Sequence, residues 1–452
     1  MRTNCKSIII AAALTLCSAF SSFAEGFLGI DGEEATSVGI YIKEIQTGKV
    51  LVDHNAQMAL TPASVMKAVT TASVLSVYGD NRRFATPVVL RGQKGSGATW
   101  QGDLVVKSCA DPTLESENFR SRMGFCDSIV ANLKRMGIKS IQGKIVVEQT
   151  LKNAGPIPQW EIEDIAWPYG AALFGFNYLD NTFTIWPATK KTKPEVPGLD
   201  VTVRKVATGN DLIRGVYSNH LVIDARDPHK KDWALKTTMP DPAAVFVTAL
   251  KSQLADAGIQ VAGKEKAVPA DSHDKALYTH RSATYGEIMR SLMVRSDNLF
   301  AEGMLRTLSP TDSRKTAINR EKDLWATRGI NTRYTIIHDG SGLTRANRLS
   351  AHFIGDILQW MAKSKHAKAY ASYFPRAGKD GTLRGFLAKS PLTGKIALKT
   401  GSVSSVQCYA GYKLDDDGNP THIIVIMVNG FFCPRRQVRE ASENLLTDLF
   451  SE

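Results

Sequence analysis

Near its beginning the chain alternates apolar and polar residues, which is the pattern of a half-buried strand. Between Ser37 and Asp53 apolar residues occupy every second position until Gln46-Thr47-Gly48 interrupts them. After Pro62 they recur at helical spacing instead, at Val65, Val69, Ala72 and Leu75. We therefore predict a β-hairpin followed by a buried helix, with Ser64 in the first turn of that helix.

The middle of the chain has a different texture. From about residue 83 to residue 280 short apolar runs such as Leu104-Val105-Val106 are separated by glycines and prolines. The stretch 192–236 carries strand signals of its own. We read this region as inserted domains that are mainly β, with 192–236 as a module nested inside the first insertion.

Helical patterns return after Thr284, and two strong strand signals follow at 407–414 and 422–429. A run of aspartates at 415–417, with Gly418 and Asn419, predicts the turn between these strands. A calcium site is the alternative for the aspartates, but a hairpin tip explains them better. The last residues, 439–450, have the pattern of an amphipathic helix.

The first 24 residues resemble a secretory signal. Two basic residues precede an apolar run from Ile8 to Phe20, and small residues follow it. This run is too short for a membrane span, and no later stretch is long enough either. A lipoprotein anchor on Cys17 is the alternative, although Leu16 is bulky where such sites have a small residue. We predict export, with residues 1–24 removed and no integral membrane span.

Four of the six cysteines lie outside this signal, in a compartment that permits disulfides. They are Cys109, Cys126, Cys408 and Cys433. Four cysteines allow three connectivities, and nearness in sequence favours Cys109–Cys126 and Cys408–Cys433. Buried free thiols are the alternative. No pair has the spacing of a redox or zinc site.

Composition narrows the class without naming a function. A chain of 452 residues favours two or three domains, and 43% hydrophobic with 22% charged residues is ordinary for a globular protein. The net charge of +12 is spread along the chain, which favours a solvated surface over nucleic-acid binding, with loose attraction to anionic polymers as the alternative. The nine histidines lack ligand spacing, so we expect no metal and no cofactor.

Candidate chemistry begins with Ser64 and Lys67, which lie three residues apart on the predicted helix. That spacing puts a hydroxyl and an amine on one helix face. A buried, neutral lysine can accept the serine proton. Alone the pattern is common, and the end of a surface helix would explain it equally well.

Two later motifs can complete a site. Ser296-Asp297-Asn298 offers a hydroxyl for proton relay and an amide that can hold a carbonyl, although a helix cap would explain it too. Lys399-Thr400-Gly401-Ser402 follows an apolar strand signal, and its cation, hydroxyls and bare glycine edge can bind a carboxylate and a peptide backbone. The three motifs in this order are the set found in serine β-lactamases and penicillin-binding proteins.

The chain resembles the class C low-molecular-mass penicillin-binding proteins, which are D-alanyl-D-alanine carboxypeptidases and endopeptidases. Beyond the three motifs, the resemblance rests on Pro62-Ala63-Ser64, Asp339-Gly340-Ser341-Gly342-Leu343 and Val428-Asn429-Gly430, and it covers nearly the whole mature chain. The Asp339 motif lacks the pattern of a nucleophile turn, so we interpret it as a structural turn near the cleft. One departure is Cys109-Ala110-Asp111-Pro112-Thr113, where the family has glycines before Asp-Pro.

The resemblance implies an α/β (α+β) fold. Its transpeptidase/β-lactamase-like domain would have an antiparallel sheet flanked by helices and would carry two inserted, mainly β domains. The implied boundaries are 25–82 with 281–452 for the penicillin-binding DD-peptidase domain, 83–191 with 237–280 for inserted domain II, and 192–236 for nested domain III. The inserted domains would orient peptidoglycan and supply no catalytic group.

It also implies a role for each site residue. Ser64 would be the acylated nucleophile, Lys67 its general base and Ser296 the proton shuttle, while Asn298 positions the peptide. The carboxylate and backbone of the substrate would be bound by Lys399, Thr400, Gly401 and Ser402. Backbone N–H groups of Ser64 and Ser402 would form the oxyanion hole, and Asp297 would support its loop.

The implied enzyme is a bacterial serine-type D-Ala-D-Ala carboxypeptidase, with DD-endopeptidase action as an extension. It would be periplasmic or otherwise extracytoplasmic, with peptidoglycan stem peptides and β-lactam antibiotics as partners. A serine β-lactamase and a non-catalytic cell-wall-binding protein remain alternatives. The oligomeric state is not predicted.

Overall fold

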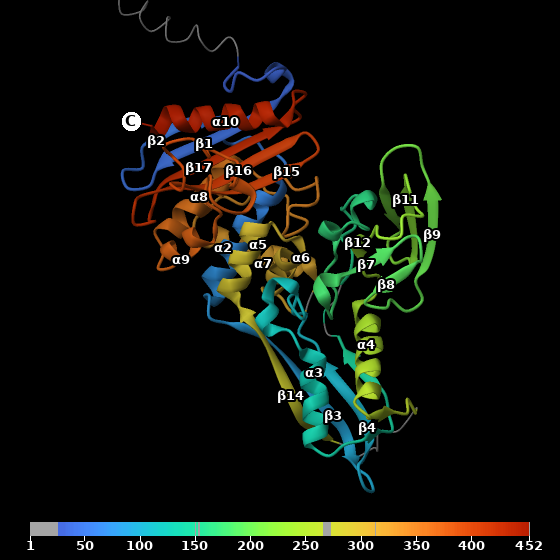
Figure 1. Ribbon diagram of the computed structural model, residues 1–452. Helices are drawn as coiled ribbons and strands as arrows, with labels where there is room; N and C mark the ends of the chain where they lie inside the picture. Colours follow the sequence, from blue (N-terminus) through green and yellow to red (C-terminus); the bar gives the residue numbers. More distant parts are fainter. Residues whose placement is uncertain (1–25, 150, 152–153, 265–272, 312, 452) are drawn as a thin grey trace, which may run out of the picture.

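The computed structural model describes residues 26–149, 151, 154–264, 273–311 and 313–451. The predicted export signal, 1–24, lies outside the described residues. Within these ranges no helix is both long enough and apolar enough to cross a membrane. Figure 1 shows an elongated molecule in which a compact body carries the first and last described residues, and the middle of the chain forms two smaller lobes beside it.

The main sheet of the body joins distant parts of the chain. Its five antiparallel strands run in the order β15-β16-β17-β1-β2. Their bounds are β1 Ser37–Glu44, β2 Val50–His54, β15 Ile396–Val403, β16 Val406–Leu414 and β17 Pro420–Asn429. The predicted N-terminal hairpin and C-terminal strands are therefore confirmed, and β1 pairs with β17 along its whole length.

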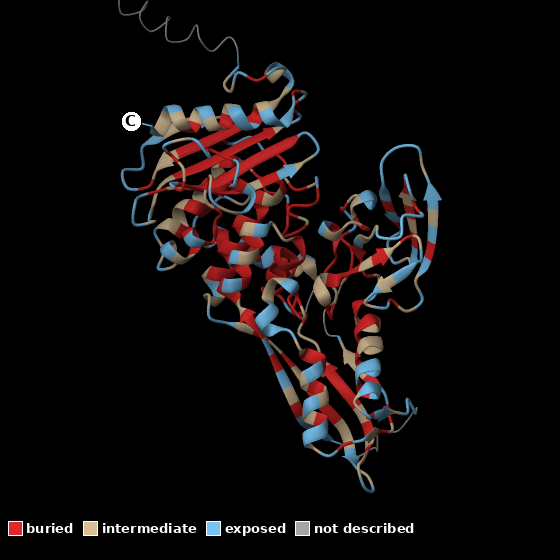
Figure 2. Ribbon diagram, in the orientation of Figure 1, coloured by how far each residue is buried: buried red, intermediate tan, exposed pale blue. Residues whose placement is uncertain are grey.

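Both faces of this sheet are covered, so its central strands are almost continuously buried (Figure 2). Helix α10 (Arg435–Phe450) lies over one face and packs against it through the buried side chains of Val438 and Leu446. The other face packs on a set of helices. These are α2 Met66–Tyr78, α5 Tyr285–Arg295, α6 Asn298–Arg306, α7 Arg314–Ala326, α8 Ala351–Ala362 and α9 Ala367–Tyr373.

Helix α2 runs through this core. All of its residues from Met66 to Leu75 are buried, so it has no solvent face over that length. A 3₁₀ turn, Ala63–Val65, leads into it and holds Ser64 two residues before the first α-helical residue. The sequence prediction for this helix is confirmed, with the difference that the turn at Ser64 is 3₁₀.

The lower lobe contains a six-stranded sheet, in which β14 pairs along β3. Its strands are β3 Arg83–Lys94, β4 Thr99–Lys107, β5 Ser140–Ile141, β6 Ile145–Glu148, β13 Gln260–Val261 and β14 His273–Thr284. Helices α3 (Phe125–Arg135) and α4 (Pro242–Asp256) pack with this sheet around one shared apolar core. Because β3 and β14 extend from the body into the lobe, they connect the two (Figure 1).

The second lobe has two three-stranded sheets. One contains β9 Asp200–Lys205, β10 Asp211–Arg214 and β11 His220–Ala225, and the other β7 Thr182–Trp186, β8 Lys191–Lys193 and β12 Leu235–Thr238. The predicted domain boundaries at 83, 192, 237 and 281 stay a prediction.

The four described cysteines are free thiols, so the predicted bridges Cys109–Cys126 and Cys408–Cys433 are wrong. Cys408 belongs to the core on the helix side of the main sheet, whereas Cys433 belongs to the core under α10. Cys126 lies in the core around α3, while Cys109 packs against the body. The prediction from nearness in sequence failed because the two cysteines of each predicted pair lie in different apolar cores. A disulfide needs two side chains that directly face each other.

Candidate active site

Lys67 lies at the centre of the three motifs. Its side chain is fully buried in the first turn of α2. Its Nζ is 2.8 Å from Ser64 Oγ, 2.6 Å from Asn298 Oδ1 and 2.6 Å from the carbonyl oxygen of Ser341. The two carbonyl oxygens can only accept, so a neutral amine gives them its two hydrogens and turns its lone pair toward the Ser64 hydroxyl. The contacts thus orient Lys67 as a base.

The surroundings of Lys67 favour its neutral form. Burial lowers the pKa of Lys67 to about 8, and the carboxylates of Asp339, Asp297 and Glu302 oppose the shift only in part. Near neutral pH a useful fraction of Lys67 is therefore uncharged, whereas an exposed lysine is almost entirely charged.

The Ser296-Asp297-Asn298 motif forms the junction between α5 and α6. Ser296 ends α5 with a left-handed backbone (φ 61°), and Asp297 caps α6 by accepting a hydrogen bond from the N–H of Phe300 at 2.9 Å. The tight junction puts Asn298 at the start of α6, where its amide reaches Lys67. Its Nδ2 donates to the carbonyl oxygen of Tyr169 at 2.7 Å, which links the inserted region to the site.

Strand β15 supplies the third motif from the edge of the main sheet. Lys399 is fully buried, and its Nζ donates to Ser296 Oγ at 2.9 Å. Burial, and then the nearby Lys67, lower the pKa of Lys399 well below its ordinary value. Gly401 faces the same way, and a Cβ there would lie 2.7 Å from Pro62 O and 2.9 Å from Ser64 N. Only glycine lets the strand approach the Ser64 turn so closely.

The structure therefore places Lys67 in hydrogen-bond contact with Ser64 and Asn298, and Lys399 in contact with Ser296. The two groups adjoin, because Ser296 and Asn298 belong to one junction and the charge of Lys67 acts on Lys399. Thr400 and Ser402 lie on the other side of β15, as strand alternation requires. Their hydroxyls donate to Thr382 Oγ1 at 2.7 Å and to Gln407 Oε1 at 3.2 Å.

Sequence reasoning missed the partner that the 339–344 loop offers to Lys67. This partner is the backbone carbonyl of Ser341, and no side-chain pattern can reveal a carbonyl. The loop is built around Asp339, whose carboxylate accepts hydrogen bonds from Gly342 N, Thr344 N and Trp160 Nε1 at 2.8–2.9 Å. The interpretation of this motif as a structural turn is confirmed.

Glu302 is the second missed residue. It lies one helical turn after Asn298 in α6, and its Oε1 accepts from Gly340 N and Ser341 N at 2.9 and 2.8 Å. One helix therefore holds Lys67 through Asn298 and holds the loop that presents Ser341 O through Glu302. Spacing from Asn298 was the one available signal.

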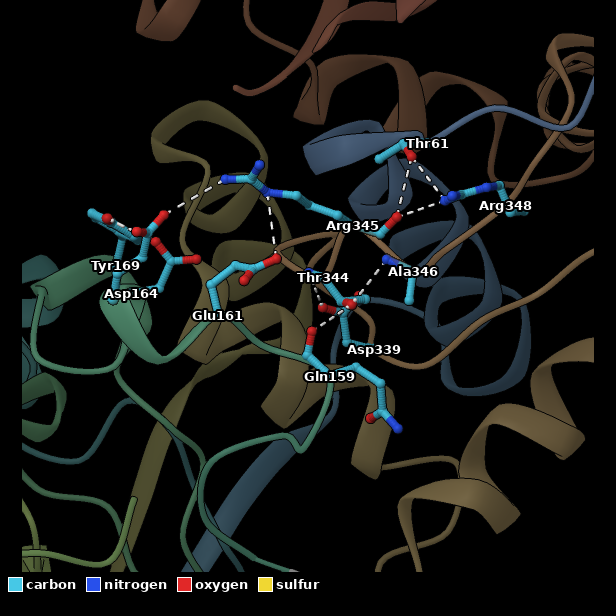
Figure 3. Close-up of polar contacts among 11 residues, drawn as sticks. Thr61, Gln159, Glu161, Asp164, Tyr169, Asp339, Thr344, Arg345, Ala346 and Arg348 are labelled. Carbon is cyan, nitrogen blue, oxygen red and sulfur yellow. Dashed lines mark hydrogen bonds and ion pairs between the residues drawn. The ribbon is translucent and has the colours of Figure 1, made fainter. Parts of the chain in front are cut away.

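The inserted region makes polar contacts with the 339–344 loop and with Arg345 (Figure 3). Tyr169 donates from its hydroxyl to Asp164 at 2.9 Å. Arg345, just after the 339–344 loop, lies 3.7 Å from both Glu161 and Glu163. Thr344 Oγ1 also donates to Gln159 O at 2.9 Å, so the loop and the insertion are attached to each other.

Two buried acids near the site predict a pH-dependent stability. Burial raises the pKa of Glu302 to about 7 and that of Glu321, on α7, to about 8. A folded-state pKa above the unfolded value near 4.5 means that the folded protein holds protons which the unfolded chain releases. Stability is then full below about pH 4.5 and declines as the pH rises through 7 and 8.

Glu321→Gln is expected to remove part of that decline, because the amide cannot ionise. At pH 8.5 we expect the free energy of unfolding of the variant to exceed that of the parent by on the order of several kcal/mol, so that the variant unfolds at a higher urea concentration. At pH 5 the two free energies of unfolding should differ little. Urea titrations followed by tryptophan fluorescence measure this, with exposed Glu34→Gln as the control. A difference of equal size at both pH values would contradict the prediction.

Comparisons with known proteins agree over most of the chain. The sequence profile of the D-Ala-D-Ala carboxypeptidase 3 (S13) family matches residues 30–448. The D-alanyl-D-alanine carboxypeptidase DacB of Haemophilus influenzae is 24% identical, over 88% of this chain and 86% of its own. A D-alanyl-D-alanine carboxypeptidase of Actinomadura sp. is 25% identical, over 87% of this chain and 78% of its own.

Solved structures give the same fold. Penicillin binding protein 4 from Haemophilus influenzae superimposes with a TM-score of 0.77 at 23% identity, covering 92% of this chain and 97% of the other. A predatory peptidoglycan endopeptidase from Bdellovibrio bacteriovorus gives 0.51 at 17% identity, covering 92% and 93%. The predicted fold class, a transpeptidase-like domain with inserted β domains, is confirmed.

Proposed function

The chain belongs to the D-Ala-D-Ala carboxypeptidase 3 (S13) family, and we propose that it hydrolyses its substrate through an acyl-enzyme on Ser64. It is accordingly a serine-type D-alanyl-D-alanine carboxypeptidase, a hydrolase of peptidoglycan stem peptides. The observation that carries the proposed chemistry is the orientation of Lys67, whose two carbonyl acceptors leave its lone pair for Ser64.

Acylation begins with the transfer of the Ser64 proton to neutral Lys67. Ser64 Oγ attacks the carbonyl carbon of the penultimate D-alanine, and the backbone N–H groups of Ser64 and Ser402 stabilise the oxyanion. The close approach of Gly401 to Ser64 N supports this pairing, because it places the backbone of β15 beside the 3₁₀ turn that carries Ser64.

Departure of the leaving group needs a proton on its nitrogen. Ser296 Oγ donates it and is resupplied from Lys399 Nζ, 2.9 Å away. The C–N bond breaks, and the terminal D-alanine leaves as an amine. The proton that Lys67 took from Ser64 passes on to Lys399, which restores Lys399 and leaves Lys67 neutral again. Lys67 then takes a proton from a water whose hydroxyl adds to the acyl carbon, and gives that proton to Ser64 Oγ as the ester bond breaks.

Substrate binding falls to β15 and α6. Because β15 is the edge strand, an extended peptide can pair with its free side at Gly401. The hydroxyls of Thr400 and Ser402 take the terminal carboxylate. The side-chain amide of Asn298 donates one hydrogen to Tyr169 O. An amide has two such hydrogens, so the second can be donated to a peptide carbonyl of the substrate.

The proposed compartment rests on the predicted export signal. An export signal at 1–24 would deliver the enzyme to the periplasm or another extracytoplasmic compartment, where the stem peptides are. β-Lactams would acylate the same Ser64 because they imitate the D-Ala-D-Ala terminus.

Incubating the enzyme with purified muropeptides and measuring the products by mass spectrometry tests the function. Loss of one D-alanine from pentapeptides supports it, and unchanged pentapeptides contradict it.

A serine β-lactamase shares the acylation chemistry but also needs a base that activates water for rapid deacylation. The stretch 299–398 offers Glu302 and Glu321 and lacks a Glu-x-x-Leu-Asn pattern. Glu302 is committed to the backbone of the 339–344 loop, and Glu321 is fully buried in the helical core. Neither is placed to activate a water at Ser64, and the intact catalytic set likewise disfavours a merely wall-binding protein.

We therefore expect penicillin to form a long-lived adduct. The penicilloyl ester stays in the site and shields the bond, whereas the natural acyl-enzyme loses its D-alanine and admits water. Intact-protein mass measurement after mixing should show one penicilloyl group that persists for minutes or longer, with nitrocefin hydrolysis slow. An adduct that vanishes within seconds while the drug is consumed would favour the β-lactamase.

A further inference from the structure

The loop backbone that accepts from Lys67 is held between helix α2 and a buried carboxylate of α6. On the α2 side, Thr70 Oγ1 donates to Gly340 O at 2.8 Å. One residue further along the loop, Lys67 Nζ lies 2.6 Å from Ser341 O. On the opposite side, the N–H groups of Gly340 and Ser341 both donate to Glu302 Oε1, at 2.9 and 2.8 Å. The peptide unit between Gly340 and Ser341 is therefore bonded on both sides.

The anchor for this loop comes from the same helix that supplies the other carbonyl acceptor of Lys67. Asn298 and Glu302 lie four residues apart in α6, so they share one face of that helix. The loop lies directly against α6 at Gly340, where a Cβ would be 2.8 Å from Leu305 Cβ. Asp339 belongs to the loop and would move with it, whereas Glu302 ties the loop to α6. This helix therefore fixes both acceptors relative to each other.

Glu302 is an unusual residue for a purely structural anchor. Its side chain is buried, and its second oxygen, Oε2, has no hydrogen-bond partner among the described residues. A buried carboxylate with an unsatisfied oxygen costs stability, and the contact with the loop offsets only part of that cost. Buried acids of this kind that adjoin a reactive group are candidates for a functional role.

We propose that Glu302 is a positioning residue for the general base: its carboxylate fixes the loop backbone so that the Ser341 carbonyl holds the Lys67 amine toward Ser64. The inference rests on the proposed function and deepens it. Glu302 acts through the loop and touches neither the nucleophile nor the base. Without it, the Ser341 carbonyl loses its fixed place, and Lys67 loses one of the two acceptors that orient its lone pair.

The charge of Glu302 gives this role a signature that a merely structural contact lacks. Burial and the charge of Asp339 raise the pKa of Glu302 to about 7, although Arg314 opposes the shift, so Glu302 is ionised where Lys67 loses its proton. Its negative charge favours protonated Lys67, which means that removing the charge alone lowers the pKa of Lys67. The other charged groups that act on Lys67 or Glu302 are Asp297, Asp339, Lys399, Arg314 and Glu321.

The test compares Glu302→Gln with Glu302→Ala by stopped-flow acylation with a saturating fluorescent penicillin from pH 6 to pH 10. Glu302→Ala removes the anchor, so we expect the plateau rate to fall about tenfold or more. Glu302→Gln keeps an oxygen that can accept from both N–H groups, so its plateau should stay within about threefold of the parent. The pH of its half-maximal rate should fall by about half a unit or more, because the charge is gone.

Glu321→Gln is the matched control, because Glu321 is equally buried and makes no hydrogen bond to the loop among the described residues. It should keep the plateau of the parent and shift the half-maximal pH by less than Glu302→Gln does. The inference is overturned if Glu302→Gln keeps the parent's half-maximal pH, if its plateau falls to that of Glu302→Ala, or if the control shifts equally.

Melting curves show whether each variant folds. If Glu302→Ala does not fold, the half-maximal pH and plateau of Glu302→Gln decide the question alone. A parent that is acylated at Ser64, with a Glu302→Gln variant whose pH profile is unchanged, overturns this inference and leaves the proposed function standing. A parent that penicillin does not acylate at Ser64 overturns both.

Discussion

Ser64→Ala is expected to abolish both peptidase turnover and covalent labelling by penicillin. The substitution removes the one atom that becomes bonded to the substrate, so no ester can form, whatever the remaining groups do. Loss of a serine nucleophile of this kind costs about 10⁴-fold or more in turnover, because the oxyanion donors and substrate contacts alone leave little catalysis. Fluorescent-penicillin labelling and D-alanine release measure the two losses independently.

The folded state should survive this change, since Ser64 lies in a 3₁₀ turn whose neighbours Ala63 and Val65 are the buried anchors. A melting temperature within a few degrees of the parent confirms it. Ser372→Ala, which removes an exposed hydroxyl bonded only to a local carbonyl on α9, serves as the control that keeps full labelling. Substantial labelling of Ser64→Ala would mean that another nucleophile carries the chemistry.

The parts of this site that follow local chain rules were open to sequence reasoning. Helical spacing places Lys67 on the face of Ser64, and strand alternation puts Lys399 and Gly401 toward Ser64 with Thr400 and Ser402 away from it. Each of these depends on one element and on side chains of distinctive chemistry. The three motifs could therefore be found before their distances were known.

What could not be predicted depends on packing between distant elements. The pairing of β1 with β17 brings residues nearly four hundred positions apart into register, and no local pattern encodes it. The Ser341 carbonyl becomes important only because Glu302 and Asp339 fix the loop beneath Lys67. The disulfide prediction failed for the same reason, since Cys408 and Cys433 are near in sequence but belong to the cores on opposite sides of the sheet.

Lys67 offers a test of how this packing produces reactivity. Burial lowers its pKa from 10.5 to about 8. At pH 7 about one such lysine in ten is neutral, compared with about one in three thousand at the ordinary value. Because only the neutral amine can accept the Ser64 proton, the rate of acylation at saturating substrate should rise with pH and level off above about 8.

Lys67→Ala is accordingly expected to lower the acylation rate by about 10³-fold near neutral pH and to remove this rise from the pH profile. The variant keeps the nucleophile and the Lys399–Ser296 contact but loses the base, and its Asn298 and Ser341 acceptors lose their buried donor. Stopped-flow acylation by a fluorescent penicillin from pH 6 to pH 10 measures both effects, and exposed Lys363→Ala is the control. A variant that keeps the parent's dependence on pH through about 8 would assign that titration to another group, and a rate within tenfold of the parent would remove Lys67 from its role as base.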